Sequence, residues 1–161
     1  KDVLGDAESL TRWWPAVYIS LDEVAPGGEG GVGRTVDLHT KGWAPYTLRW
    51  RLRITEPMTD EGFALSAEGD LNGTGVWTFA QDGPEVVITY DWRISAAKPL
   101  LRRLSWLLKP AFSANHHWAM RKGEESLRLE MRRRRNGGRD AASVPPPPLA
   151  TFPRLLRATG H

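Results

Sequence analysis

The segment NHHWAMRKGEESL, residues 115–127, lies at the centre of the longest helical pattern in the chain, which runs from Ala111 to Arg135. At about 1.5 Å per residue, this pattern predicts a rod of roughly 36 Å. Asn115 and His116 interrupt an otherwise apolar face of the rod. Because a helix with one apolar face needs a second layer to cover it, we expect the rest of the chain to surround this helix. The apolar residues of that face are Phe112, Ala119, Leu127 and Met131.

Six stretches before this helix alternate apolar and polar side chains, which is typical of strands with one covered face. Only short turns separate them, so they predict an antiparallel meander. The predicted fold class is therefore α+β, with a curved antiparallel sheet wrapped around the long C-terminal helix. The predicted strands cover residues 16–24, 34–40, 46–55, 63–68, 75–80 and 86–95.

Two shorter helical patterns flank these strands. Residues 1–14 predict one or two short helices, with Asp6 as an N-cap. Residues 98–108 predict another helical segment, because leucines recur there at intervals of three and four. Pro110 follows this segment. Since proline lacks an N–H and cannot continue the hydrogen-bond ladder, it should kink or break the helix before the long one begins.

Composition predicts one globular domain followed by a tail. A chain of 161 residues with 40% hydrophobic and 25% charged residues is ordinary for a single globular domain. We expect this domain to cover residues 1–135 and residues 136–161 to form a disordered, basic, proline-rich tail. The absence of cysteine excludes disulfides and thiolate sites. No apolar run is long enough for stable membrane insertion, and no signal peptide is visible, so we expect a cytoplasmic protein.

Charge is distributed unevenly along the chain. Residues 1–98 carry 9 Lys/Arg against 15 Asp/Glu, and residues 99–161 carry 13 against 4. A basic half can indicate a nucleic-acid or acidic-membrane partner. The alternative is that residues 132–135 end the long helix, where cations offset the helix dipole. No aromatic residue is interleaved with these arginines to stack on bases, so we predict no nucleic-acid partner.

Two further patterns are weak indicators of cofactors. Gly28, Gly30 and Gly33 match the spacing of a dinucleotide-binding loop, but the next residues alternate like a strand instead of opening a helix. We therefore interpret the loop as a wide hairpin and predict no cofactor. The histidines at positions 39, 116, 117 and 161 form no metal-ligand pattern, and we predict no metal.

Several segments together resemble the SRPBCC superfamily, and within it the START-like and bacterial polyketide cyclase/dehydrase or lipid-transport-like proteins. The resemblance covers about residues 1–135. It implies a helix-grip fold and a cavity between the sheet and the C-terminal helix. The family pattern begins with a strand before the first helix, whereas this sequence starts at Lys1 inside that helix. Either residues that precede Lys1 are missing from the sequence, or the sheet is one strand short. The segments that carry the resemblance are residues 12–15, the glycine loop up to Gly33, and residues 69–75, 90–92 and 115–124.

The resemblance implies binding of a hydrophobic small molecule, such as a lipid or a polyketide, in that cavity. One alternative is a cyclase or dehydratase in the same cavity, with His116 and Tyr90 as weak candidates for catalytic groups. A second alternative is an interaction module with a filled core. The sequence does not decide whether the protein is an enzyme, and it is silent on the oligomeric state. The candidate ligand-binding residues are Tyr46, Leu48, Trp50, Phe63, Leu65, Trp77, Phe79, Tyr90, Trp92, Phe112, Asn115, His116 and Ala119.

Overall fold

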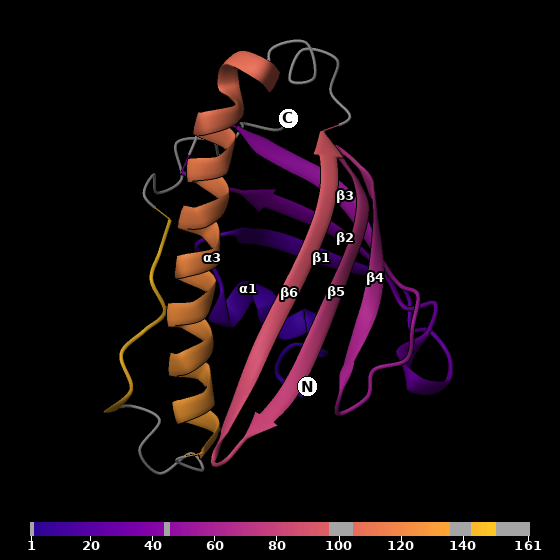
Figure 1. The fold of residues 1–161 in the computed structure, drawn as a ribbon, viewed down its shortest axis with the longest axis vertical. Coiled ribbons are helices and arrows are strands. Elements are labelled where there is room, and N and C mark those ends of the chain that lie inside the picture. The colour runs from indigo at the N-terminus through magenta and orange to yellow at the C-terminus, as the bar shows by residue number, and fades with distance from the viewer. Residues whose placement is uncertain (1, 44–45, 97–104, 136–142, 151–161) are drawn as a thin grey trace, which may run out of the picture.

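The computed structural model describes residues 2–43, 46–96, 105–135 and 143–150. Its architecture is α+β: a six-stranded antiparallel sheet in simple meander order and a long C-terminal helix (Figure 1). This agrees with the predicted α+β class and with the predicted antiparallel meander. The strands are β1 (Tyr18–Ala25), β2 (Thr35–Lys41), β3 (Thr47–Ile54), β4 (Gly62–Gly69), β5 (Leu71–Asp82) and β6 (Glu85–Ala96). The helices are η1 (Ala7–Ser9), α1 (Leu10–Trp13), η2 (Glu29–Gly31) and α3 (Ser105–Arg135).

Each predicted strand stretch forms one strand. The fifth is longer than predicted and starts at Leu71, because residues 71 and 72 pair with the end of β6. Alternation places Trp50 beside Leu38 on β2, and Leu52 beside Ala67 on β4. These apolar side chains form the buried core of the sheet. The other face carries charge, and Arg51 donates to both carboxylate oxygens of Asp37 at 2.6 and 2.8 Å.

The sheet curves strongly, and α3 stands along its open side (Figure 1). Over residues 110–135, the most buried face of α3 consists of Gly123, Ser126 and Glu130. These residues are spaced by three and four, so they lie on one side of the helix. The four apolar residues of the predicted face are only partly buried. The helix therefore meets the N-terminal segment through a glycine, a serine and a glutamate, which an apolar pattern does not reveal.

Trp13 and Trp14 form the surface against which α3 packs. Trp14 lies directly against Gly123, and Trp118, Met120 and Leu127 pack around the same cluster. Asp6 is the N-cap of η1, as predicted, because its side chain accepts a hydrogen bond from the Ser9 N–H at 3.3 Å. This local cap fixes the start of the segment that leads into α1.

Pro110 does not break the helix, so the prediction of a break was wrong. α3 begins at Ser105 and continues through Pro110 to Arg135. A proline removes one hydrogen bond, and a helix of 31 residues retains most of its ladder. Residues 98–104 of the predicted leucine-rich helix lie outside the described residues, as do residues 136–142 and 151–161 of the predicted tail. Within the described part of the chain, no helix is long and apolar enough to cross a membrane.

Candidate functional site

Six aromatic side chains form a connected series on the face of the sheet that carries the core. We call this the ring series and its face the ring face. Tyr90 and Trp77, opposite one another on β6 and β5, stack with ring centroids 3.9 Å apart and an interplanar angle of 11°. Neighbouring rings continue the series at centroid distances of 5.3 to 6.3 Å. Its members are Trp50, Trp92, Tyr90, Trp77, Phe63 and Phe79.

A glycine makes room for two of these rings. Gly75 pairs with Trp92 across β5 and β6, and a Cβ at position 75 would lie 2.5 Å from the Trp92 ring. The same Cβ would lie 3.0 Å from the ring of Tyr90. Any larger residue at this position would push both rings off the sheet surface. The stacking of Trp92 and Tyr90 therefore depends on this glycine.

The ring series changes from buried to partly buried along the sheet. Trp50 and Phe63 are buried, whereas Trp77, Tyr90 and Trp92 are only partly covered. The aliphatic residues on the ring face of β6 are exposed: Val86 by 49%, and Ile88 and Ile94 by 37% each. The β5–β6 end of the ring face thus presents apolar surface that the described residues do not fully cover. Exposed apolar area of this kind is costly in water and favours an apolar partner.

Two tyrosines contribute hydroxyl groups to this part of the fold. Burial raises the pKa of Tyr90 far above its ordinary value of 10.0, and the nearby Tyr18 raises it further. Burial also raises the pKa of Tyr18. Both phenols therefore stay protonated at neutral pH. A neutral phenol can donate a hydrogen bond to a ligand oxygen but cannot serve as a base there.

The remaining candidate ligand-binding residues lie in the N-terminal half of α3. They are on the side of the helix that contacts α1 in its C-terminal half. Phe112, Ala119 and Ser126 are spaced by seven residues, or about two helical turns, so they share a face. Phe112 lies edge-on to Tyr46 at a centroid distance of 6.5 Å. Asn115 accepts a hydrogen bond from the Trp43 N–H at 2.9 Å and packs directly against Gly42. Its amide therefore ties α3 to the segment between β2 and β3.

His116 is exposed, in contrast to its neighbour Asn115. Its ring centroid lies 6.1 Å from that of His117. Partial burial lowers the pKa of His116 from its ordinary value, and the charge of His117 lowers it further. Both effects favour the neutral form of the imidazole. The other predicted residues Leu48, Leu65 and Phe79 pack in the core clusters of the sheet, and Ala119 is partly buried on α3.

A hollow of about 370 Å³ lies on the charged face of the sheet, opposite the ring series. His39 and Arg49, paired across β2 and β3, line it together with Asp22 and Glu68. The Nε2 atom of His39 is buried and has no hydrogen-bond partner among the residues that the structure describes. Burial and Arg49 both lower the pKa of this histidine. Basic and acidic side chains line the hollow side by side, so its charge favours neither a cationic nor an anionic ligand. Sequence analysis did not identify it.

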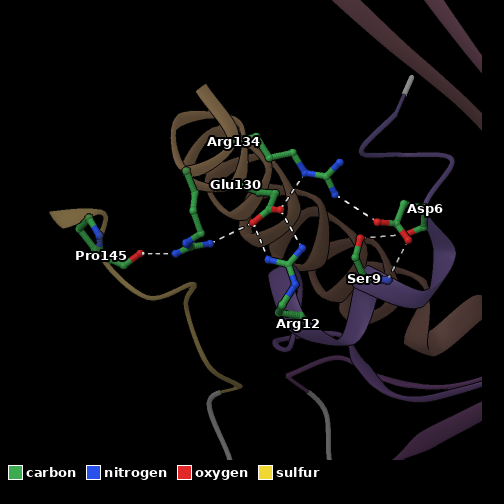
Figure 2. Close-up of polar contacts among 7 residues, drawn as sticks. Asp6, Ser9, Arg12, Glu130, Arg134 and Pro145 are labelled. Atoms are coloured by element: carbon green, nitrogen blue, oxygen red, sulfur yellow. Dashed lines mark hydrogen bonds and ion pairs between the residues drawn. The ribbon is translucent and has the colours of Figure 1, made fainter. Parts of the chain in front are cut away.

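The most enclosed ionic cluster lies where α3 meets α1 (Figure 2). The side chain of Glu130 is 2% exposed and accepts hydrogen bonds from three arginines. Arg12 donates two, at 2.8 and 2.9 Å, from a residue on α1. Arg133 and Arg134 donate one each, at 3.0 and 2.9 Å, from the next turn of α3.

The surroundings of Glu130 hold its carboxylate in the charged form. The bond from Arg12 is the main cause and those from Arg134 and Arg133 add to it, so that the pKa of Glu130 is lowered to about 2. Arg134 also reaches Asp6 at 3.2 Å, and Arg133 donates to the Pro145 carbonyl at 3.2 Å (Figure 2). The cluster connects the N-terminal segment, α3 and Pro145, so its role is structural. Sequence analysis did not identify this cluster. The signal in the sequence was an acidic residue, Glu130, placed shortly before four consecutive arginines on the helix.

No group of three or more His, Asp or Glu residues within the described residues is arranged to hold a metal ion. Comparison of the chain with protein-family models, with curated proteins and with solved structures yields no match. The class that the geometry defines is thus an α+β protein whose sheet presents a partly buried aromatic face beside a long helix. The family resemblance remains a prediction.

Proposed function

We propose that this chain has the helix-grip architecture and binds a hydrophobic small molecule, such as a lipid or polyketide, against the ring face. The partly buried end of the ring series, Trp77, Tyr90 and Trp92, is the observation that carries the proposal. Aromatic walls with a few polar groups are typical of sites for small apolar molecules. A ligand covering these rings would remove apolar surface from water at roughly 25 cal/mol per Å².

The arrangement of α3 supports the same proposal. The C-terminal half of its inward side is occupied by Trp13, Trp14 and the Glu130 cluster. The N-terminal half carries Phe112, Asn115 and Ala119, which are only partly buried. Apolar groups from the helix and from the ring face would together surround a ligand. The Tyr90 hydroxyl would donate a hydrogen bond to a ligand oxygen and so fix its orientation.

Saturable binding of two probes tests the proposal: the apolar dye 1-anilinonaphthalene-8-sulfonate and a long-chain fatty acid. We expect Trp77→Ala to weaken binding of both by about tenfold, since an aromatic contact contributes roughly 0.5–1.5 kcal/mol beyond its buried area. Val87→Ala is the matched control, because Val87 is exposed on β6 but lies on the opposite face from Ile88. Absence of saturable binding, or equal weakening by both substitutions, would contradict the proposal.

The cyclase or dehydratase alternative would use the same face. Its support is the neutral Tyr90 phenol within apolar surroundings, which suits polarisation of a carbonyl group. With an identified substrate, Tyr90→Phe should then lower kcat while leaving ligand affinity within a few-fold, because only the hydroxyl is lost. Unchanged kcat would remove Tyr90 from the mechanism.

The cytoplasmic location expected from the sequence stays a prediction.

A further inference from the structure

Tyr18 and Tyr90 come from different sides of the curved sheet and approach one another on its ring face. Tyr18 is the first residue of β1, and Tyr90 lies in β6. Tyr18 and Trp92, which follows Tyr90 on the same face, both pack on one buried core cluster of β2, β3 and β4. The curvature of the sheet therefore brings the two tyrosines together over this cluster (Figure 1). The influence of Tyr18 on the pKa of Tyr90 agrees with this proximity.

Aromatic rings hold both tyrosine side chains in place. The ring of Tyr18 lies edge-on to that of Trp14 at a centroid distance of 5.3 Å, and Trp14 in turn packs on α3. The ring of Tyr90 stacks on Trp77 at 3.9 Å and on Trp92 at 5.3 Å. Because rings packed in this way have little freedom to turn, the fold fixes the positions of the two hydroxyls.

The two hydroxyls have no hydrogen-bond partner among the described residues. The described side-chain atoms that are fully buried without a partner include the indole nitrogens of Trp13 and Trp14 but neither phenol oxygen. Each phenol oxygen thus keeps accessible surface. Burial nevertheless raises the pKa of both phenols, so protein surrounds the space that they face. Because hydroxyls inside proteins are normally hydrogen-bonded, this pair requires a partner from another molecule.

We propose that the hydroxyls of Tyr18 and Tyr90 together bind a carbonyl oxygen of an uncharged apolar ligand, such as an aromatic ketone or ester. A carbonyl oxygen has two lone pairs and can accept one hydrogen bond from each phenol. The rings that flank the two tyrosines would cover the apolar part of the same ligand. This inference rests on the proposed function, because it uses the same face, and it names the class of ligand bound there.

The distribution of charge favours an uncharged ligand over an anion. Arg51 of β3 and Arg93 of β6 alternate with the ring-face residues, so they lie on the opposite face, where each is paired with an aspartate. Arg12 of α1 is held by Glu130. These cations are therefore not available to a carboxylate between the two phenols. Burying an unpaired charge is costly, whereas a carbonyl group needs only the two donors.

Equilibrium dialysis with a matched pair of naphthalenes tests the proposal. 2-Acetylnaphthalene carries a carbonyl group, and 2-ethylnaphthalene has nearly the same shape without an acceptor. We expect Tyr18→Phe and Tyr90→Phe each to weaken binding of the ketone by about fivefold and to leave binding of the hydrocarbon within about twofold, because each removes one hydrogen bond. Thr89→Val is the control and should affect neither probe, since it removes a hydroxyl beside Tyr90 on the opposite face.

The outcomes separate this inference from the proposed function. Equal effects of the two tyrosine substitutions on both probes, or no effect on either, would overturn the inference and leave the proposed function standing. That result includes the case in which a water molecule alone joins the hydroxyls. Failure of the unmodified chain to bind either probe saturably would remove both. Tighter binding of ionised 2-naphthoate than of 2-acetylnaphthalene at pH 8 would show that the site takes an anion, which also overturns the inference.

Infrared spectroscopy of the bound ketone gives a measurement that needs no substitution. The carbonyl stretch of isotope-labelled 2-acetylnaphthalene should lie lower in the complex than in an apolar solvent, because two hydrogen bonds weaken the carbonyl bond. A stretch at the apolar-solvent frequency would overturn the inference. The double variant with Tyr18→Phe and Tyr90→Phe should return the stretch to that frequency, with near-ultraviolet circular dichroism showing that it is folded.

Discussion

Arg12 and Glu130 lie 118 positions apart in the chain and are joined by two hydrogen bonds of 2.8 and 2.9 Å. The guanidinium presents both donors to one carboxylate, which is the geometry of a bidentate pair. Because Arg12 belongs to α1 and Glu130 to α3, this contact holds the long helix in place beside the sheet. The position of the ring face relative to the helix therefore depends on it.

Loss of the charge on Glu130 should destabilise the fold. We expect Glu130→Gln to lower the free energy of unfolding by roughly 2–3 kcal/mol, because three arginines lose their shared acceptor charge. The value lies below that of a wholly buried pair because the Arg12 side chain is 54% exposed. Urea denaturation measures it. Glu124→Gln is the control, since Glu124 pairs with Arg128 on the exposed helix surface and should change stability by less than about 0.5 kcal/mol.

The same carboxylate should make stability depend on pH in the acid range. The pKa of Glu130 falls from its ordinary value of 4.5 to about 2 on folding. A lowered pKa means that the stabilisation is present above pH 4.5 and is lost as pH falls toward 2. The stability difference between the wild type and Glu130→Gln should therefore shrink across that window. A difference that stays constant down to pH 2 would show that the charge is not responsible.

Tyrosine ionisation should be suppressed in the folded protein. Burial raises the pKa of all three tyrosines, Tyr18, Tyr46 and Tyr90. Ultraviolet difference spectroscopy should show little tyrosinate at pH 10 in the native protein and about half ionisation in urea. Because the folded pKa values lie above those of the unfolded chain, this stabilisation is present below pH 10 and is lost above it. Native ionisation near pH 10 would contradict the packing of Tyr90.

Replacement of Gly123 by alanine should reverse the usual sign of that substitution in a helix. Alanine is normally more favourable than glycine by about 1 kcal/mol inside a helix. Here a Cβ would lie 2.6 Å from Cη2 of Trp14, so Gly123→Ala should destabilise by roughly 1–3 kcal/mol. Ser113→Ala, at an exposed position of the same helix, should be neutral or slightly stabilising. Thermal unfolding of both variants measures the difference, and a stabilised Gly123→Ala would show that α3 does not pack on Trp14.

Local periodicity predicted the strands and the faces of their residues well. Tyr90 and Trp92 were placed on one face because a strand has a period of two, and both belong to the ring series. Predictions for the helix were weaker. Its most buried residues are Gly123, Ser126 and Glu130, none of which an apolar pattern selects. Pro110 was also misread, since its effect depends on the rest of the helix around it.

The sequence by itself determined where the strands run, which side chains share a face and where the long helix ends. These properties follow from backbone geometry repeated over neighbouring residues. Only the tertiary structure decided that Glu130 meets Arg12, that Trp14 lies on Gly123 and that the β5–β6 end of the ring face stays half-exposed. Such contacts join residues far apart in the chain, so they depend on the curvature of the sheet and the placement of the helix. Neither quantity is encoded in any short stretch of residues.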